Sequence, residues 1–378
     1  VFPVTVDPSA VTNYADSQDT FVQTGYSTSN DTSGELRIGT WDGGTDYAAT
    51  YLDFSSLSSK LAHDTIYGAK LYLDEIWSYS CTAEPVSVYK VTQSWSAGSI
   101  ANYPGPSYNS TALGTANFAA GYTGCPTPAW EHINLGSAGT SLVKSWADGG
   151  SNYGLTVRAP TSGQVSCGAA ATVDCGWKKF DSDNAASGAN APYLAVTYSP
   201  YNADYAFPSS PPTVSPAVTN NQAGYVDVEV TNKGHSTWST TNGYDLSYEV
   251  YQGTSGCTGT QVSTTAAQTP MPSSVAYGQT VTVHAKINPL PPGSYTVCFD
   301  MVHKTSSGTD LFSAWGVPRT AQLGLAVVSV PPNLTAMYPD NNYQVDTLTP
   351  QLFAAASSAD GYPTSTVNYQ FTVCAGPY

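Results

Sequence analysis

The sequence carries very little charge, and most of that charge is negative. Only 10% of its 378 residues are charged, and 12 basic residues stand against 27 acidic ones, which gives a formal net charge of −15. Binding to nucleic-acid phosphates needs a basic surface, so the composition argues against a nucleic-acid partner. The sequence also lacks any run of about 18 apolar residues, and we therefore expect no membrane insertion.

The motifs of several enzyme classes are missing as well. There is no Gly-X-Ser-X-Gly elbow, phosphate-binding loop or Gly-rich dinucleotide turn, and the five histidines lack metal-ligand spacing. The charged neighbours on expected strands are Asp74-Glu75 and Glu131-His132. Adjacent strand residues point to opposite faces, so neither pair alone supplies the two facing carboxylates of a glycosidase. We predict that the chain is not an enzyme and has no cofactor or metal.

One short segment is rich in side-chain oxygens. FDSDNA contains Asp181, Asp183 and Asn184, and such hard ligands suit Ca²⁺. The same residues are typical of a turn in which Asp and Asn side chains bond the nearby backbone. We favour the turn, and whether calcium binds near Asp181 stays open.

Residues that favour strands and turns are abundant. The chain has 33 Gly, 26 Pro and 27 Tyr, but only 3 Met. Its apolar runs alternate with polar residues, as in AKLYLDE and YVDVEV, which is the period of a half-buried strand. These features predict an all-β protein. The alternation breaks at Glu75-Ile76, which predicts a bulge just before Trp77.

Two short helices are the exception to this pattern. One is expected over residues 55–60. The other is expected over residues 140–148, where Leu142, Val143 and Trp146 recur at helical spacing. Thr140 or Ser141 stands where a helix N-cap is needed, and Gly149 stands where the helix would end.

The seven cysteines form no Cys-X-X-Cys pair, so disulfides in an oxidising, extracytoplasmic compartment are the simpler interpretation. The first four cysteines allow three pairings. We predict that Cys81 pairs with Cys125, which would pin the long polar loop 96–128. We also predict that Cys167 pairs with Cys175, which would close a small loop.

The remaining three cysteines lie in the second half of the chain. We predict a bond between Cys257 and Cys298, and because alternation places Cys298 opposite the apolar face of its strand, we expect a peripheral staple. Cys374 is left without a partner, in a segment about half the length of a sandwich module. We therefore expect the native polypeptide to continue past Tyr378.

The first part of the chain carries a family resemblance. TSLVKSWADGGSNYGLTVRA, WKKFDSDNA and PYLAVTY, preceded by ADSQDTFVQTG, ELRIGT and YLDFSSL, resemble in their order and spacing a DNRLRE-type domain. The six-letter signature itself is absent, and Ala101 stands where relatives usually have tryptophan before an Asn-X-Pro turn. That family consists of extracellular jelly-roll sandwiches, close to some carbohydrate-binding modules and common in large secreted actinobacterial RHS-repeat proteins. The resemblance implies a secreted or cell-surface jelly roll over residues 1–200.

The second part resembles other modules. The set YDLSYEVY, LPPGSY and AWGVP resembles the small immunoglobulin-like modules of secreted bacterial proteins. The expected organisation is therefore a Pro/Ser linker over 201–212, an immunoglobulin-like β-sandwich over 213–330, and a partial immunoglobulin- or fibronectin-like module over 331–378.

Aromatic residues in or beside polar loops are the main functional signal. A flat ring with a polar tip can stack on a sugar. Some of these rings have an alternative role, because Trp177 can pack over the Cys175 disulfide and Trp77 can cap the core. The candidate sugar-binding residues are Trp41, Trp77, Tyr79, Tyr103, Tyr108 and Trp177.

Two functions fit these observations. The first is a non-catalytic binding or adhesion segment that recognises polysaccharide or cell-wall glycan through the first domain. The second is a structural stalk, shell or filament segment of a large RHS-type protein, with the rest of its own chain as partner. A polysaccharide-active enzyme is a distant third.

Overall fold

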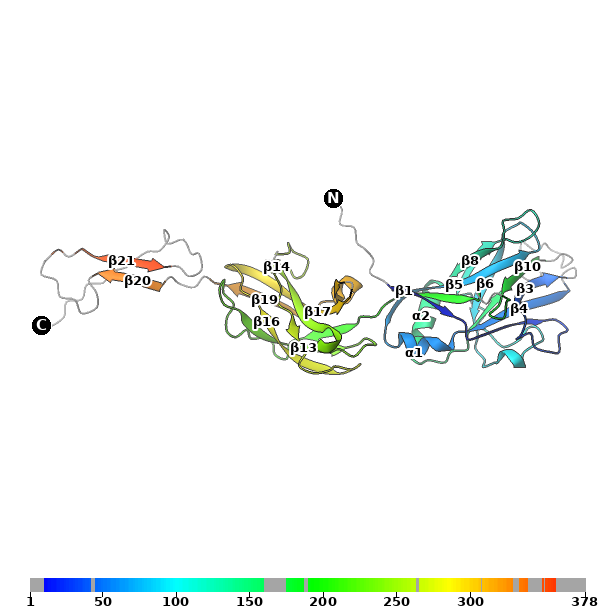
Figure 1. The fold of residues 1–378 in the computed structure, drawn as a ribbon, viewed down its shortest axis with the longest axis horizontal. Helices are drawn as coiled ribbons and strands as arrows, with labels where there is room; N and C mark the ends of the chain where they lie inside the picture. The colour runs from blue at the N-terminus through cyan, green and yellow to red at the C-terminus, as the bar shows by residue number, and fades with distance from the viewer. Residues whose placement is uncertain are drawn as a thin grey trace. The chain divides into compact units, whose positions relative to one another are not determined.

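The chain folds into β-sheets. The computed structural model describes residues 10–41, 45–159, 175–186, 190–262, 265–306, 308–328, 333–338, 349 and 351–357. The chain divides into two compact units, Val1–Asn202 with Lys233–Ser236 and Ala203–Asn232 with Thr237–Tyr378. Strands dominate both units (Figure 1), which confirms the all-β prediction, while the jelly-roll and immunoglobulin topologies stay predictions. Among the described helices, none is long and apolar enough to cross a membrane.

An 11-stranded curled sheet forms the first unit (Figure 1). Its strand order is β1-β11-β5-β10-β3-β4-β9-β6-β7, with β2 paired to β4 and β8 paired to β5. The strands are β1 (Ala10–Ala15), β2 (Gln18–Gln23), β3 (Glu35–Trp41), β4 (Asp46–Asp53), β5 (Thr65–Ser78), β6 (Glu84–Lys90), β7 (Gly114–Phe118), β8 (Ala129–Asn134), β9 (Leu155–Arg158), β10 (Cys175–Asp181) and β11 (Tyr193–Ser199).

Strand β5 holds this sheet together. It is 14 residues long and pairs with β11, β10 and β8. Lys179 of β10 is opposite Trp77 and the next residue, Phe180, is opposite Glu75, so Ile76 has no partner on β10. The predicted bulge is therefore confirmed.

The helices lie where the sequence predicts, with one shifted boundary. Residues 55–60 form the 3₁₀ turn η1 (Ser55–Leu57) followed by α1 (Ser58–Leu61). Helix α2 (Gly136–Ala147) begins earlier than predicted and has no side-chain cap, so the prediction of a cap at Thr140 or Ser141 is wrong. Thr140 instead donates a hydrogen bond from its Oγ1 to the Gly136 carbonyl one turn back, at 2.8 Å.

The α2 helix closes over the core of the first unit. Its Val143 and Trp146 are buried together with Leu71 and Leu73 of β5 and Phe180 of β10. A second, smaller apolar cluster lies around Val22, Ala49, Tyr51 and Val91. The sheet is therefore covered on more than one side.

The predicted long loop 96–128 is partly structured. It contains the 3₁₀ turn η2 (Ala97–Ser99) and strand β7, which pairs with β6. The Cys81–Cys125 disulfide forms as predicted. Cys167 and Cys374 lie outside the described residues, and with them the Cys167–Cys175 bond.

The described residues of the second unit form three sheets, β12-β13-β16, β15-β14-β17-β18 with β19 on β17, and β20-β21. Residues 203–206 of the expected linker form β12. The elements are β12 (Ala203–Ala206), β13 (Gly224–Asn232), η4 (Thr240–Asn242), β14 (Tyr244–Gln252), β15 (Thr269–Pro270), β16 (Thr280–Ile287), β17 (Gly293–Thr305), β18 (Gly308–Leu311), η5 (Phe312–Trp315), β19 (Gln322–Val327) and the separate hairpin β20 (Asn333–Tyr338) and β21 (Phe353–Ser357).

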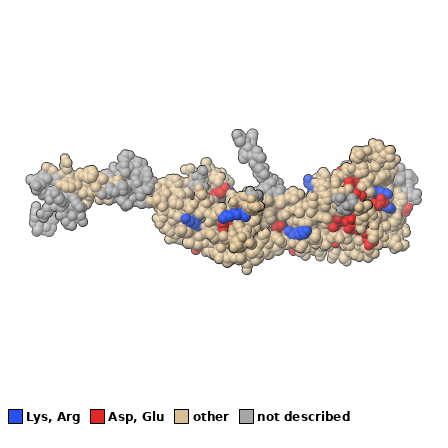
Figure 2. All heavy atoms as spheres, viewed as in Figure 1, with Lys and Arg blue, Asp and Glu red and all other residues tan. Residues whose placement is uncertain are grey.

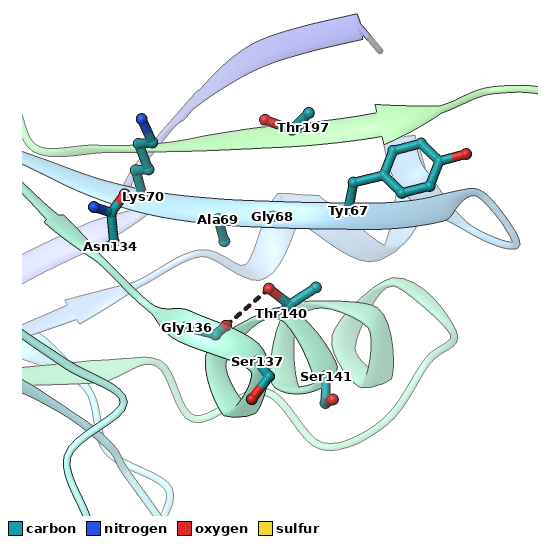
Figure 3. Close-up of a pocket in the computed structure, with 10 residues that line it drawn as sticks. All are labelled: Tyr67, Gly68, Ala69, Lys70, Asn134, Gly136, Ser137, Thr140, Ser141 and Thr197. Atoms are coloured by element: carbon teal, nitrogen blue, oxygen red, sulfur yellow. Dashed lines mark hydrogen bonds between the residues drawn. The ribbon is translucent and has the colours of Figure 1, made fainter. Parts of the chain in front are cut away.

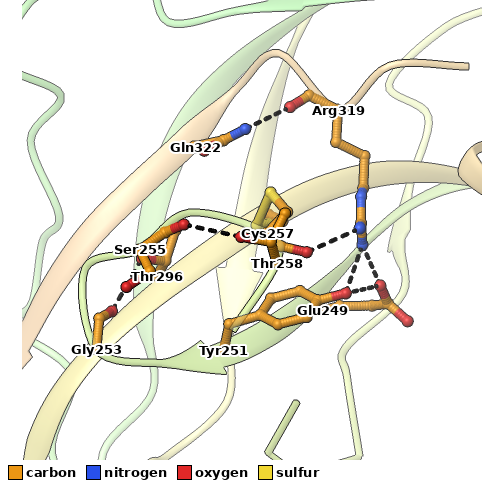
Figure 4. The surroundings of a disulfide bond; sticks show 10 residues. Glu249, Tyr251, Gly253, Ser255, Cys257, Thr258, Thr296, Arg319 and Gln322 are labelled. Carbon is orange, nitrogen blue, oxygen red and sulfur yellow. Dashed lines mark hydrogen bonds and ion pairs between the residues drawn. A yellow bond between two sulfur atoms is a disulfide. The ribbon is translucent and has the colours of Figure 1, made fainter. Parts of the chain in front are cut away.

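The Cys257–Cys298 disulfide joins a loop to β17 (Figure 4). Arg319 donates to the Cys257 carbonyl of this loop at 3.5 Å, and it is held on β14 by an ion pair with Glu249 and a 3.1 Å hydrogen bond to the Tyr251 hydroxyl. The predicted pairing is confirmed. The expectation of a peripheral bond is wrong for Cys298, whose side chain is 0% exposed. Strand β17 lies between β14 and β19, and the loop that bears Cys257 is bonded to Cys298.

Candidate functional site

Four of the six predicted aromatic residues lie at neighbouring strand ends. Trp41 ends β3 and its ring centroid is 4.6 Å from that of Trp177 in β10. Trp77, at the end of β5, packs edge-on against Tyr122. The backbone N–H of Tyr79 donates to the Trp177 carbonyl at 2.9 Å. All four residues are half-buried, and Trp41 and Trp177 contact each other.

The other two predicted residues, Tyr103 and Tyr108, surround the cation Arg158. The guanidinium carbon lies 4.0 Å from the Tyr108 ring centroid and 5.4 Å from that of Tyr103. Arg158 Nη2 donates to the Tyr51 hydroxyl at 2.6 Å and to the Pro104 carbonyl at 2.7 Å. Arg158 therefore fixes the loop that carries both tyrosines, and this gives the two rings a structural role.

A different group of rings crosses the outer face of the sheet. The Tyr72 ring of β5 stacks on Tyr193 of β11, with centroids 4.7 Å apart and planes 8° apart. On its other side it stacks on His132 of β8 at 5.4 Å. Trp130 of β8 reaches across to Tyr193 at 5.1 Å and is 39% exposed. We call Trp130, His132, Tyr72 and Tyr193 the aromatic strip.

The register of strands β8, β5 and β11 places the residues of the aromatic strip side by side. Tyr72 is directly opposite His132 on one side and Tyr193 on the other. Alternation in β8 turns Trp130 and His132 outward, while Ile133 is 0% exposed. Directly paired side chains on one sheet face have Cβ atoms only about 4.5–5.5 Å apart, so the rings must meet.

A hollow adjoins the aromatic strip, between the sheet and the start of α2 (Figure 3). Lys70 and Asn134 are paired one register row beyond Tyr72 and His132, and both line the hollow. Its volume is about 530 Å³. The wall is mainly small and hydroxyl-bearing, formed by Tyr67, Gly68, Ala69, Lys70, Asn134, Gly136, Ser137, Thr140, Ser141 and Thr197.

Two carboxylates flank the other end of the aromatic strip. Asn190 donates from its Nδ2 to Asp74 at 2.6 Å and to Asp181 at 3.3 Å. Burial raises the pKa of Asp74, and the negative charge of Asp181 adds to that effect. The Asn190 amide therefore bridges these two carboxylates, and Asp74 is 7% exposed.

The FDSDNA segment forms a turn, as favoured by the sequence. The backbone N–H of Ala185 donates to the Ser182 carbonyl at 3.1 Å, and the N–H of Asn184 donates to Ser182 Oγ at 3.1 Å. The bonding side chain is thus Ser182 and not an Asp. Asp183 turns toward the beginning of the chain, where its N–H donates to Asp19 Oδ2 at 2.9 Å.

The visible surface matches the low charge of the sequence. Figure 2 shows mostly uncharged residues, with acidic atoms gathered on the first unit. An uncharged, hydroxyl-rich and aromatic surface favours neutral polar ligands over polyanions.

Sequence reasoning missed the aromatic strip. Trp130 and His132 were visible as outward residues of one strand, but Tyr72 and Tyr193 lie far from them in the chain. Only the strand order β8-β5-β11 brings them together. No sequence motif marks that order.

Comparison with known proteins gives distant relatives. No protein-family model matches the chain. It is 28% identical over 262 residues to the tRNA nuclease WapA of Bacillus subtilis strain 168 and to the tRNA(Glu)-specific nuclease WapA of Bacillus subtilis subsp. natto. It is 27% identical over 257 residues to the tRNA3(Ser)-specific nuclease WapA of Bacillus spizizenii. Each match covers 63% of this chain but only 9% of the relative.

Solved structures give only low similarity scores. A putative β-galactosidase from Bacteroides fragilis has a TM-score of 0.21 at 12% identity, over 77% of this chain and 39% of that one. The β-glucuronidase of Parabacteroides merdae has a TM-score of 0.18 at 10% identity, over 76% and 28%. Red sea bream transglutaminase has a TM-score of 0.23 at 11% identity, over 81% and 32%.

Proposed function

We propose that this chain is a non-catalytic extracellular binding segment of a larger secreted or surface protein, and that it recognises polysaccharide. The observation that carries the proposal is the aromatic strip, which lies on an open sheet face beside a polar hollow. Rings supply the apolar contact for the C–H face of a pyranose, and nearby polar groups bond its hydroxyls. Trp130 is 39% exposed, whereas Tyr72 and Tyr193 are half-buried.

The polar groups around the aromatic strip fit the hydroxyls of a sugar chain. At one end, Lys70 and Asn134 provide donors and acceptors at the entrance to the hollow. At the other end, Asp74 and Asp181 are acceptors already oriented by Asn190. Side chains two residues apart on one face of a strand are separated by about 6.8 Å. The surface therefore offers successive contacts along a chain, as an extended polysaccharide requires.

The relatives also support a non-catalytic segment. Two of them are named as nucleases specific for different tRNAs, tRNA(Glu) and tRNA3(Ser). This chain matches 9% of each, at nearly equal identity. A region shared by proteins with different tRNA specificities is a poor candidate for the part that selects the tRNA. The net charge of −15 likewise disfavours RNA binding by the segment itself.

The two disulfides of the described residues fit an oxidising compartment. We infer that the parent protein is secreted or displayed on the cell surface. The resemblance of the first part of this chain to DNRLRE-type domains of RHS-repeat proteins supports the same location. Presentation of a glycan-binding surface outside the cell would hold such a protein at a cell wall. A purely structural stalk is the competing function.

A glycan array probed with the full chain, followed by calorimetry on the best ligand, tests the proposal. We expect Trp130→Ala to weaken binding at least about tenfold, or about 1.4 kcal/mol, with an unchanged melting temperature. Tyr277→Ala removes a ring that is 50% exposed in the second unit and serves as the matched control.

Three results contradict the proposal in different ways. Failure to bind any glycan supports the structural stalk. Loss of binding in Trp41→Ala but not in Trp130→Ala moves the site to the Trp41–Trp177 contact. Glycan cleavage abolished by Asp74→Asn shows an enzyme.

A further inference from the structure

Three carboxylates from distant parts of the chain meet at one edge of the first unit. Asp16 lies in the turn between β1 and β2, Asp19 lies in β2, and Asp183 follows β10. One oxygen from each lies within 4.8 Å of the other two. The group is separate from the aromatic strip, and the proposed function assigns it no role. Of its three members, only Asp183 belongs to FDSDNA, the segment whose oxygens suit Ca²⁺ but for which the sequence favours a turn.

Asp16 is the unusual member of this group. Both of its carboxylate oxygens are completely shielded from water, yet neither receives a hydrogen bond. Asp19 is 3% exposed and accepts one bond, from the backbone N–H of Asp183 at 2.9 Å. Buried carboxylates in folded proteins are hydrogen-bonded, paired with a cation or bound to a metal. One Asp16 oxygen lies within 4.8 Å of an oxygen of each of the other two carboxylates.

The charges acting on Asp16 increase this cost. Asp19 and Asp183 each place a carboxylate oxygen within 4.8 Å of one of its own, and the repulsion between these like charges adds to the cost of burial. A positive charge at the centre of the group would offset the free-energy cost of burying these carboxylates and would cancel their mutual repulsion.

We propose that Asp16, Asp19 and Asp183 bind one Ca²⁺ ion. Ca²⁺ takes oxygen ligands at about 2.3–2.6 Å, so two oxygens on one ion are at most about 5 Å apart. The observed separations, within 4.8 Å, fit this limit. The remaining ligands are water and backbone carbonyls, and they reach the ion from the side of Asp183, which is exposed.

The chemistry of the ligands selects the ion. Three carboxylates without His or Cys are hard ligands, which disfavour Zn²⁺ and favour Ca²⁺ or Mg²⁺. Mg²⁺ requires a compact octahedron and keeps several of its waters. Asp19 is buried and the two carboxylate oxygens of the half-buried Asp16 are shielded from water, which leaves little room for a hydrated ion on their side.

The ion would fasten the start of the chain to the β10–β11 connection. Asp16 also donates its backbone N–H to the Pro192 carbonyl at 3.2 Å, and β1 pairs with β11. The site therefore stabilises the edge of the sheet where the first strand attaches. Extracellular calcium modules bind at about 0.1–1 mM, and we expect this range.

Calorimetry and thermal unfolding of the full chain test the site. We expect one Ca²⁺ per chain, half-saturation near 0.1–1 mM, and a higher melting temperature in Ca²⁺ than in EGTA, with a smaller effect from Mg²⁺ at equal concentration. Asp16→Asn and Asp19→Asn should abolish the calcium response. Asp31→Asn is the matched control, because the Asp31 carboxylate already accepts a bond from Ser29 at 2.7 Å.

A second measurement separates a ligand from a residue that merely supports the fold. Asp16→Asn keeps the shape of the side chain and replaces a carboxyl group crowded by two other carboxylates with a neutral amide, so in EGTA this variant should be as stable as the parent or more so. Asp183→Asn lies on an exposed turn and should fold in any case, with calcium affinity reduced at least about tenfold. The proposal is wrong if the parent chain shows no calcium response, or if the response survives in both Asp16→Asn and Asp183→Asn.

Discussion

Lys178 and Glu75 form an ion pair in the interior of the first unit. The Lys178 Nζ lies 2.7 Å from Glu75 Oε1, and both side chains are 0% exposed. The ammonium also donates to Ser78 Oγ at 3.0 Å and to the Phe118 carbonyl at 2.5 Å. Burial raises the pKa of Glu75 to about 7 and lowers the pKa of Lys178. The pair connects β5 to β10 where their register shifts.

Removing one partner of this pair should be costly. Lys178→Met leaves the buried Glu75 without its cation, and we expect a loss of about 3–5 kcal/mol in the free energy of unfolding, measured in urea. The double variant Lys178→Met/Glu75→Gln should recover part of this loss. The control is Lys179→Met, which breaks a half-exposed pair with Glu35 and should cost no more than about 1 kcal/mol. Equal losses for Lys178→Met and Lys179→Met would contradict this account.

From the contacts of Arg158, we predict that replacing this residue lowers stability without weakening ligand binding. Arg158→Met removes two hydrogen bonds and the ring contacts of Tyr103 and Tyr108. Charge-assisted hydrogen bonds contribute about 1.5–3 kcal/mol, so we expect a loss of about 2–3 kcal/mol in urea unfolding. Glycan affinity should change less than twofold. A large loss of affinity at full stability would return Tyr103 and Tyr108 to the binding site.

The Cys81–Cys125 bond should stabilise the first unit through its loop. The two cysteines are 44 residues apart, and loop-closure entropy for such a loop gives about 4 kcal/mol. We expect the Cys81→Ser/Cys125→Ser variant to lose about that amount and to be cleaved by protease near Tyr122. Cys257→Ser/Cys298→Ser is the control, because that bond lies in the second unit. Equal cleavage near Tyr122 in both variants would be evidence against the pinning role.

Asp300 should make the second unit less stable as the pH rises. Burial raises its pKa from 3.8 to about 6, although Ser313 and the Tyr205 hydroxyl donate to it. The folded state then binds more protons than the unfolded state between about pH 4 and 6, so stability falls with increasing pH over that window. The shift of about 2 units corresponds to about 3 kcal/mol.

Urea unfolding of the full chain at several pH values measures this effect. Asp300→Asn should flatten the slope between pH 4 and 6, while Asp227→Asn, at a side chain that is 53% exposed, should keep it. An unchanged slope in Asp300→Asn would show that another group is responsible.

Local patterns predicted many of the strands and both helical segments, but not every boundary. Alternation predicted the strands and the bulge at Ile76, because the side-chain period of a strand is set by the backbone. Helical spacing predicted α2 but placed its start at Thr140 and not at Gly136, since nothing in the sequence distinguishes the first turn when no side chain caps it. Cysteine spacing predicted both described disulfides.

The candidate sites depended on tertiary structure. The alternation of polar and apolar residues indicates the strand face on which Tyr72, His132 or Tyr193 lies. It does not indicate which strands pair, and the aromatic strip forms only because the strand order is β8-β5-β11. The same limit hid the meeting of Asp16 with Asp183, which are 167 positions apart in the sequence (183 − 16). For the same reason, the sequence suggested that Tyr103 and Tyr108 were available for a ligand. Arg158 is far from both in the sequence and contacts them only in the folded chain. Local chemistry fixes the direction of each side chain, whereas long-range pairing decides its neighbours.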